Sequence, residues 1–289
     1  LATFLAVLLA AGLGVLPSDS IADSTISLIH RHAYGANIGW LDWRPSAAAG
    51  VVIGEFVCSG YIYAANVGWI HLGHGTPING IRYQNNSATD YGVNHDGRGN
   101  LRGLAWGANI GWVNFEDVGA PKVDLLTGWL SGFIYGANVG WISLSNSQAS
   151  VKTESILQSL ADTDADGLPD AWELDHAGNL TTLQAGGDAD GDGQLDGQEY
   201  LADTDPFDPN STLRITQYHC SPGGDRNTIT WTSVPTRVYR ILKTNDVAVP
   251  FPGGDVGWGL IPPDAGPTTT RDFTDTPSPL RFFRVQAIR

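Results

Sequence analysis

The amino-acid sequence predicts a mainly β protein built from several modules, and three observations support this. The 289-residue chain contains 36 glycines and 10 tryptophans, a composition that favours strands and turns over helix bundles. A phrase of the form (Gly/Ala)-Ala-Asn-(Ile/Val)-Gly-Trp occurs four times before residue 150. Fifteen of the thirty acidic residues then fall between Thr153 and Leu213, a stretch without Lys or Arg. We therefore expect an N-terminal β domain, an acidic spacer and a C-terminal β domain.

Residues 1–22 have the character of an export signal. The run LATFLAVLLAAGLGVLP is apolar but too short for a convincing membrane span, and Ser-Ile-Ala at 20–22 fits a small-x-small cleavage site. We predict a signal peptide over 1–22 and a secreted mature protein that starts near Asp23 and has no transmembrane span. The alternative is an N-terminal anchor that stays in place.

Four repeats predict four β-hairpins over residues 23–149. An alternating strand such as Phe-Ile-Tyr enters, an Ala-Asn-x-Gly turn follows, and the tryptophan begins the exit strand. Asn and Gly accept the positive φ that tight turns require. Aromatic side chains dominate packed β cores. We therefore expect a sandwich or barrel-like stack of hairpins with a core that includes Trp40, Trp112 and Trp141.

Two twelve-residue stretches in the predicted spacer, 150–211, have the pattern of calcium-binding loops. DTDADGLPDAWE starts at Asp162 and DADGDGQLDGQE at Asp188, and each has carboxylates at positions 1, 3, 5, 9 and 12 with glycine at 6. Ca²⁺ takes roughly six to eight oxygen ligands, which this spacing supplies. The alternative is a solvated acidic linker. The predicted ligands are the side chains of Asp162, Asp164, Asp166, Asp170, Glu173, Asp188, Asp190, Asp192, Asp196 and Glu199, and the backbone carbonyls of Leu168 and Gln194.

The acidic segment also resembles a known kind of calcium module. The run DADGDGQLDGQEYLADTDPFDP is similar to the thrombospondin type 3-like calcium repeats of bacterial surface proteins, a resemblance that covers roughly 50 residues. It implies a calcium-stiffened spacer with EF-hand-like loops and short helices, in which Asp203, Asp205 and Asp208 complete neighbouring sites. We also expect a short helix in the preceding stretch, VKTESILQSLAD.

One repeat carries a histidine, His71, where its siblings carry Asp42, Asn114 and Ser143. His71 lies two residues after Trp69, so a strand places both side chains on one face. His74 follows in the turn HLGHG, and His95 lies in the polar loop YGVNHDGRGN. Imidazole is a common ligand of copper and zinc, so these residues are candidate metal ligands. The alternative is that His71 is a polar strand residue that faces solvent.

The second family resemblance concerns these residues. The GANIGW repeats, the Trp-x-His of GWIHLGHGTPING and the loop NNSATDYGVNHDG resemble the surface-associated copper-binding proteins of methanotrophic bacteria (MopE/CorA-like) over about 120 residues. In that family, copper is held by two histidines and a kynurenine formed from tryptophan. The resemblance implies a mononuclear copper site at Trp69 (as kynurenine), His71 and His95, with His74 as the alternative second histidine. It also implies a protein of the bacterial outer surface.

The chain alternates again after residue 212, in NTITWTSV, RVYRILKT and LRFFRVQAI, with Pro and Gly between these runs. This pattern and the module's length predict an immunoglobulin- or fibronectin-like β-sandwich over 212–289. Cys58 and Cys220 fall in different predicted domains. We therefore expect both to be free and buried, or used between chains.

The composition also narrows the function. A net charge of −14 argues against a nucleic-acid partner. The sequence carries no nucleophile elbow, zinc-protease motif or phosphate loop, so we expect no enzymatic activity. The predicted function is a surface-associated metal-binding protein with cell-surface or matrix components as partners. The alternatives are a structural or adhesive protein with calcium as its only metal, and a carbohydrate-binding accessory module that uses exposed aromatic residues.

Overall fold

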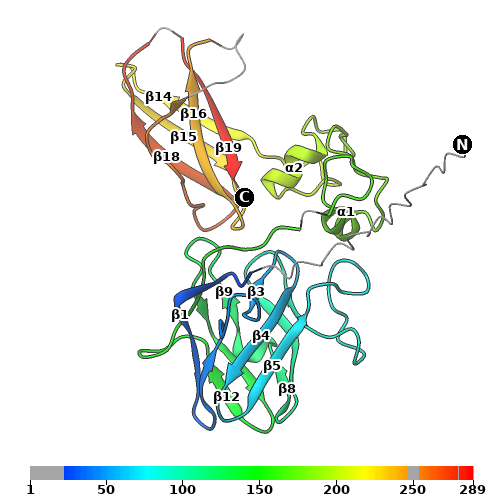
Figure 1. The fold of residues 1–289 in the computed structure, drawn as a ribbon. Coiled ribbons are helices and arrows are strands. Elements are labelled where there is room, and N and C mark those ends of the chain that lie inside the picture. The colour runs from blue at the N-terminus through cyan, green and yellow to red at the C-terminus, as the bar shows by residue number, and fades with distance from the viewer. Residues whose placement is uncertain (1–22, 160, 247–253, 279, 289) are drawn as a thin grey trace, which may run out of the picture.

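The structure is a computed structural model that describes residues 23–159, 161–246, 254–278 and 280–288. The predicted signal peptide lies outside these residues. Strands dominate the described chain, and its two α-helices are short, so the prediction of a mainly β protein is confirmed. Two β domains are joined by a segment that contains both helices (Figure 1).

Four β-hairpins form the N-terminal domain, and each contains one repeat. They are β1 (Ile26–Gly35) with β2 (Gly39–Asp42), β4 (Cys58–Ala64) with β5 (Gly68–His74), β7 (Leu101–Gly107) with β8 (Gly111–Asn114), and β11 (Phe133–Gly136) with β12 (Gly140–Ser143). Each hairpin pairs antiparallel with the next, and β12 pairs with β1 (Figure 1). The sheet of these eight strands therefore closes on itself, which removes the exposed edges of an open sheet.

Shorter strands surround this closed sheet. β3 (Val52–Ile53) pairs with β4, β6 (Val93–His95) with β7, and β13 (Val151–Thr153) with β1. β9 (Lys122–Val123) pairs with β10 (Leu130–Ser131), and the 3-10 helix η1 (Asp117–Gly119) follows β8.

β13 corrects the prediction of a helix in the stretch 151–162. That stretch begins with a strand, and none of its described residues is helical. Val151 and Thr153 are buried beside β1, so tertiary packing overrides the local helix propensity. The first β domain consequently extends to Thr153, past the predicted boundary at residue 149.

Aliphatic side chains fill most of the inside of the closed sheet, and Trp43 and Phe115 complete the same core. The residue after each repeat tryptophan points inward and is at most 1% exposed, as seen for Leu41, Ile70, Val113 and Ile142. Because side chains alternate along a strand, the tryptophans point outward. Their exposed fractions are 42–49%, so the prediction of a core position is wrong for Trp40, Trp112 and Trp141. An eight-stranded closed sheet has an interior just wide enough for side chains to fill, and branched aliphatic residues suit that space better than four indoles at one level.

A ring of asparagine side chains links the four hairpin turns. The Nδ2 of Asn66 donates to the carbonyl of Ile38 in the preceding turn at 3.0 Å. Asn109 and Asn138 repeat this bond around the domain, and Asn37 donates to Val139 of the fourth turn, each at 3.0 Å. The glycine before each tryptophan has a φ of 76–84°, which an L-residue with a side chain adopts only with strain. The glycine of the repeat therefore permits the turn, and its asparagine connects each hairpin to the neighbouring one.

The spacer contains α1 (Asp170–His176) and α2 (Asp196–Ala202), each of which begins at the ninth position of a predicted loop. Leu168, Trp172 and Leu183 form a small core with Phe56 of the first domain. The rings of Trp172 and Tyr200 lie 5.6 Å apart and connect the two helices. Neither helix of the described chain has the length and apolar composition that a membrane-spanning helix needs.

The C-terminal domain has two three-stranded sheets with a shared core. One contains β14 (Ile215–Cys220), β15 (Arg226–Thr232) and β18 (Thr268–Thr274), and the other β17 (Gly254–Asp255), β16 (Val238–Thr244) and β19 (Phe282–Ile288). Ile229, Trp231, Tyr239 and Ile241 fill the core. Cys220 is a half-buried free thiol in this domain, and Cys58 is a buried free thiol in the first. Burial raises the pKa of the Cys58 thiol to about 12, which keeps it protonated and unreactive.

The asparagine ring predicts the effect of one substitution. Asn109→Ala removes the bond to Val67 and is expected to lower the free energy of unfolding of the first domain by about 1 kcal/mol. Denaturant unfolding followed by tryptophan fluorescence measures this. Asn86→Ala, at an exposed asparagine outside the repeats, is the control and is expected to leave the transition unchanged. Equal stability of the Asn109→Ala variant and the natural protein would contradict the role of the ring.

Candidate metal centres

The first predicted calcium loop brings its acidic side chains together. Donor oxygens of Asp162, Asp164 and Asp166 lie within 4.8 Å of one another. Glu173, in the first turn of α1, is fully buried, and neither of its carboxylate oxygens has a hydrogen-bond partner. A buried carboxylate without a partner is energetically costly. A divalent cation between these four side chains would supply the missing partner.

The second loop repeats this arrangement. Donor oxygens of Asp188, Asp190 and Asp192 lie within 4.8 Å of one another. Glu199 is fully buried; its Oε2 has no partner, and its Oε1 accepts a hydrogen bond from Thr204 at 3.2 Å. The two sites therefore share one design, in which three loop aspartates face a glutamate from the first turn of a helix.

The aspartates at the ninth position, which are predicted calcium ligands, hold the backbone of their loops. Asp170 accepts hydrogen bonds from the backbone N–H of Thr163 at 2.7 Å and from its hydroxyl at 2.5 Å. Asp196 accepts from the backbone N–H groups of Ala189 and Gln184 at 2.9 and 3.0 Å. Both carboxylates therefore brace the loop backbone, as Asp162 and Asp188 also do through backbone N–H groups of their own loops.

The predicted backbone ligands come from the seventh position of each loop. No hydrogen bond within the described residues occupies the carbonyl of Leu168 or Gln194. The Gln194 side chain donates to the Thr204 hydroxyl at 2.6 Å and accepts from the Leu213 N–H at 2.9 Å. Sequence analysis did not single out Thr204, which follows α2 and contacts Glu199 and Gln194. A lone threonine carries no pattern that would have revealed it.

Burial and crowding shift the titration of both glutamates. Burial, followed by the charges of Asp166 and Asp164, raises the pKa of Glu173 to about 7. Burial also raises the pKa of Glu199 to about 7, with Asp190 and Asp192 adding to the effect while the Thr204 hydrogen bond opposes it. Without a cation, each glutamate therefore holds a proton more readily than an exposed glutamate does.

The candidate copper residues are only partly brought together. The imidazole rings of His71 and His74 lie 4.5 Å apart. Tyr61 packs on His71 at 4.6 Å and contacts Trp69 at 5.9 Å, so Trp69 lies on the same outer face. Burial, followed by the charge of His74, lowers the pKa of His71 to about 4. The His71 ring is therefore neutral at physiological pH, the form in which imidazole binds metals.

Tyr91 covers His71 on the outer face. Its hydroxyl lies 2.7 Å from His71 Nδ1, and its ring contacts His71 and Trp112 at 5.7 and 5.1 Å. With Nδ1 engaged, Nε2 is the ring atom of His71 that a metal would use. Tyr91 stands in the loop quoted for the copper resemblance, but its role was not predicted.

The structure does not support His95 as the second copper ligand. Its Nδ1 lies 3.0 Å from the Gly54 carbonyl, and its Nε2 accepts a hydrogen bond from the Gly99 N–H at 3.1 Å. The ring is buried, and within the described residues the three histidines do not form a cluster of donor atoms. His95 braces the loop before β7, whereas His74, the predicted alternative, adjoins His71.

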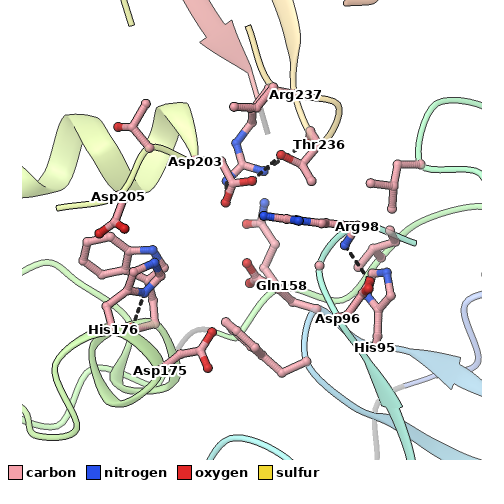
Figure 2. Close-up of a pocket in the computed structure, with 18 of the residues that line it drawn as sticks. His95, Asp96, Arg98, Gln158, Asp175, His176, Asp203, Asp205, Thr236 and Arg237 are labelled. Carbon is pink, nitrogen blue, oxygen red and sulfur yellow. Dashed lines mark hydrogen bonds and ion pairs between the residues drawn. The ribbon is translucent and has the colours of Figure 1, made fainter. Parts of the chain in front are cut away.

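The three parts of the chain meet around a cavity of about 680 Å³ (Figure 2). On its C-terminal side, buried Arg237 pairs with Asp203 at 3.3 Å and donates to the carbonyls of Tyr200 and Leu201 at the end of α2. On the opposite side, Arg82 of the first domain pairs with Asp175 of α1. These ion pairs tie one helix to each β domain.

Comparisons with protein-family models, with curated proteins and with solved structures find no match for this chain.

The environment of His95 predicts its titration. Burial lowers the pKa of His95, and a proton on Nε2 would face the N–H of Gly99. Because the folded-state value lies below the unfolded value of about 6.5, this contribution to stability is complete above pH 6.5 and is lost as the pH falls towards the folded-state pKa. Ring ¹⁵N and ¹³C NMR shifts across pH 4–8 measure it. A His95 ring that titrates at or above 6.5 would contradict these contacts.

Proposed function

We propose that the protein is an exported, surface-associated metal-binding protein with two structural calcium sites and one copper site. The observation that carries the calcium proposal is the burial of Glu173 and Glu199 with three partnerless oxygens between them. An acidic linker without a cation would expose these side chains to water. Here the charges of loop aspartates act on both glutamates, an arrangement that a divalent cation would stabilise.

The proposed role of calcium is to stiffen the connection between the two β domains. Asp192 of the second loop accepts a hydrogen bond from Thr212 at 2.5 Å, and Gln194 accepts one from Leu213. These partners begin the C-terminal domain, so an ordered loop fixes where that domain starts. The first loop leads directly into α1, which Arg82 holds against the first domain. Cations in both loops would therefore hold both ends of the spacer.

We also propose the finer architecture. The spacer is EF-hand-like, since each loop has glycine at position 6 with positive φ and ends in a glutamate on a short helix. The C-terminal domain, with two three-stranded sheets around Trp231, is immunoglobulin- or fibronectin-like. We propose that both modules serve a non-catalytic surface protein.

The copper proposal uses His71 and His74, with Trp69 as the precursor of kynurenine. Three observations support it: the two imidazoles are adjacent, the His71 ring is neutral, and Tyr61 packs against both His71 and Trp69. Copper accepts such nitrogen ligands. The competing function, a structural or adhesive surface protein with calcium as its only metal, keeps the calcium sites and leaves His71 as a partner of Tyr91. Retention of copper distinguishes the two.

Calcium removal is predicted to loosen the full chain. Binding to the folded state alone stabilises by about 2.7 kcal/mol per site when free calcium is one hundred times Kd. Excess chelator is therefore expected to lower the melting temperature, and titration calorimetry is expected to give two calcium ions per chain. Glu173→Gln and Glu199→Gln are each expected to remove one of them. Glu154→Gln, at an exposed glutamate outside both loops, is the control.

An identical melting curve with calcium and with chelator would contradict the calcium proposal. So would an unchanged stoichiometry of two in the Glu173→Gln variant.

Copper binding has a chemical readout of its own. We expect the purified mature chain to retain one copper after dialysis and the Trp69 peptide to show the mass of kynurenine. His71→Ala and His74→Ala are each expected to lose the copper, while His219→Ala, in the other β domain, retains it. An unmodified Trp69 in a protein that retains no copper would remove this proposal and leave calcium as the only metal.

A further inference from the structure

An aromatic band surrounds the closed sheet of the first domain. Each repeat tryptophan lies directly opposite an aromatic residue on the entry strand of its hairpin, with ring centroids 4.6–5.4 Å apart. All eight side chains point outward and are 38–49% exposed. We define the aromatic band as Tyr34, Trp40, Tyr63, Trp69, Trp106, Trp112, Tyr135 and Trp141.

The residue two positions after each tryptophan lies beside the band residue of the next hairpin. At three of these four places the polar group is engaged within the protein. Asp42 forms an ion pair with Arg31 at 3.5 Å, His71 is bound by Tyr91, and the Ser143 hydroxyl donates to the carbonyl of Ser145 at 2.9 Å.

The fourth place, between β8 and the last hairpin, is open. A hollow of about 280 Å³ is lined by Phe133, Tyr135 and Trp141 together with Asn114 and Glu116. Asn114 uses its Oδ1 to accept the Glu116 N–H at 2.7 Å, but its amide NH₂ bonds to no other described residue. The Glu116 carboxylate is exposed and likewise forms no ion pair or hydrogen bond within the described chain. Three aromatic side chains therefore line the hollow together with one free donor, the Asn114 amide, and one free acceptor, the Glu116 carboxylate.

The wall opposite the band is held in place. Gly119 of η1 lies against β11, where an added Cβ would come within 2.0 Å of the Phe133 carbonyl oxygen and 3.2 Å of the Trp141 ring. Only glycine permits this approach, so η1 packs directly against β11 beside the hollow.

We propose that this hollow binds a sugar ring of a neutral glycan. A pyranose has an apolar C–H face that packs on an indole or phenol ring, and equatorial hydroxyls that donate to a carboxylate and accept from an amide. A few placed polar groups among aromatic walls are typical of ligand sites. No Lys or Arg lines the hollow, and Glu116 and the net charge of −14 repel acidic sugars, so charge complementarity selects an uncharged glycan. This inference does not depend on either metal.

The test is binding of the calcium-loaded full chain to an array of neutral and acidic oligosaccharides. We expect at least one neutral glycan to bind, and its affinity to fall at least tenfold in Trp141→Ala. Trp40→Ala changes the matching position of the first hairpin, where Asp42 is paired, and is the control that keeps binding. Glu116→Gln alters only an exposed, unpaired carboxylate, so it provides a well-folded second variant and is expected to weaken binding severalfold.

Three results would overturn the proposal: binding of no neutral glycan, a preference for acidic glycans, or equal binding by the natural protein and both hollow variants. Sedimentation and vesicle flotation with zwitterionic lipid test two other occupants. Self-association or lipid binding that is lost in Trp141→Ala, without glycan binding, would assign the hollow to a second copy or to a membrane surface instead.

Discussion

Closure of the first sheet is the constraint on which the rest of this domain depends. The pairing of β12 with β1 and the ring of asparagine bonds fix four hairpins in a circle. The interior of the closed sheet is just wide enough for side chains to fill. The inward-facing residues, which are every second residue of each hairpin, must therefore be small or branched. The tryptophans are therefore displaced to the outside, where they form the aromatic band. Closure also decides that the face of the second hairpin on which alternation places Trp69 and His71 is the outer one.

A second constraint governs the acidic segment. Each of its two loops gathers three aspartates whose donor oxygens lie within 4.8 Å of one another, and a glutamate of each loop is buried. Burial and the nearby negative charges also raise the pKa values of Glu173 and Glu199. The proposed cations would relieve this repulsion, and the effect would extend further because Asp192 and Gln194 also contact the start of the C-terminal domain. The charge within the second loop and the position at which the C-terminal domain starts are therefore linked.

The sequence predicted the parts that depend on local pattern. Four hairpins and two glutamate-ended loops follow from spacing, because turn chemistry and ligand spacing act within a dozen residues, whereas the short helices were implied by the resemblance of the acidic segment. The features that depend on closure of the sheet, such as the outward direction of the tryptophans, were not predicted. Alternation placed each tryptophan and the residue two positions later on one face, but only the ring of strands decides whether that face is inside. The same limit applies to the second histidine: His95 is distant from His71 in sequence, and its hydrogen bonds to Gly54 and Gly99 arise from tertiary packing. Residues 151–153 became a strand because β1 offered an edge to pair with.

The central claim of this account is that Glu173 and Glu199 are buried because each faces a cation. Anomalous diffraction from crystals of the full chain grown with terbium, a lanthanide that replaces calcium at oxygen sites, locates such ions directly. The account predicts two strong peaks, one beside Glu173 among Asp162, Asp164 and Asp166, and one beside Glu199 among Asp188, Asp190 and Asp192. A map without a peak at either glutamate, with lanthanide only at scattered surface carboxylates, would contradict it.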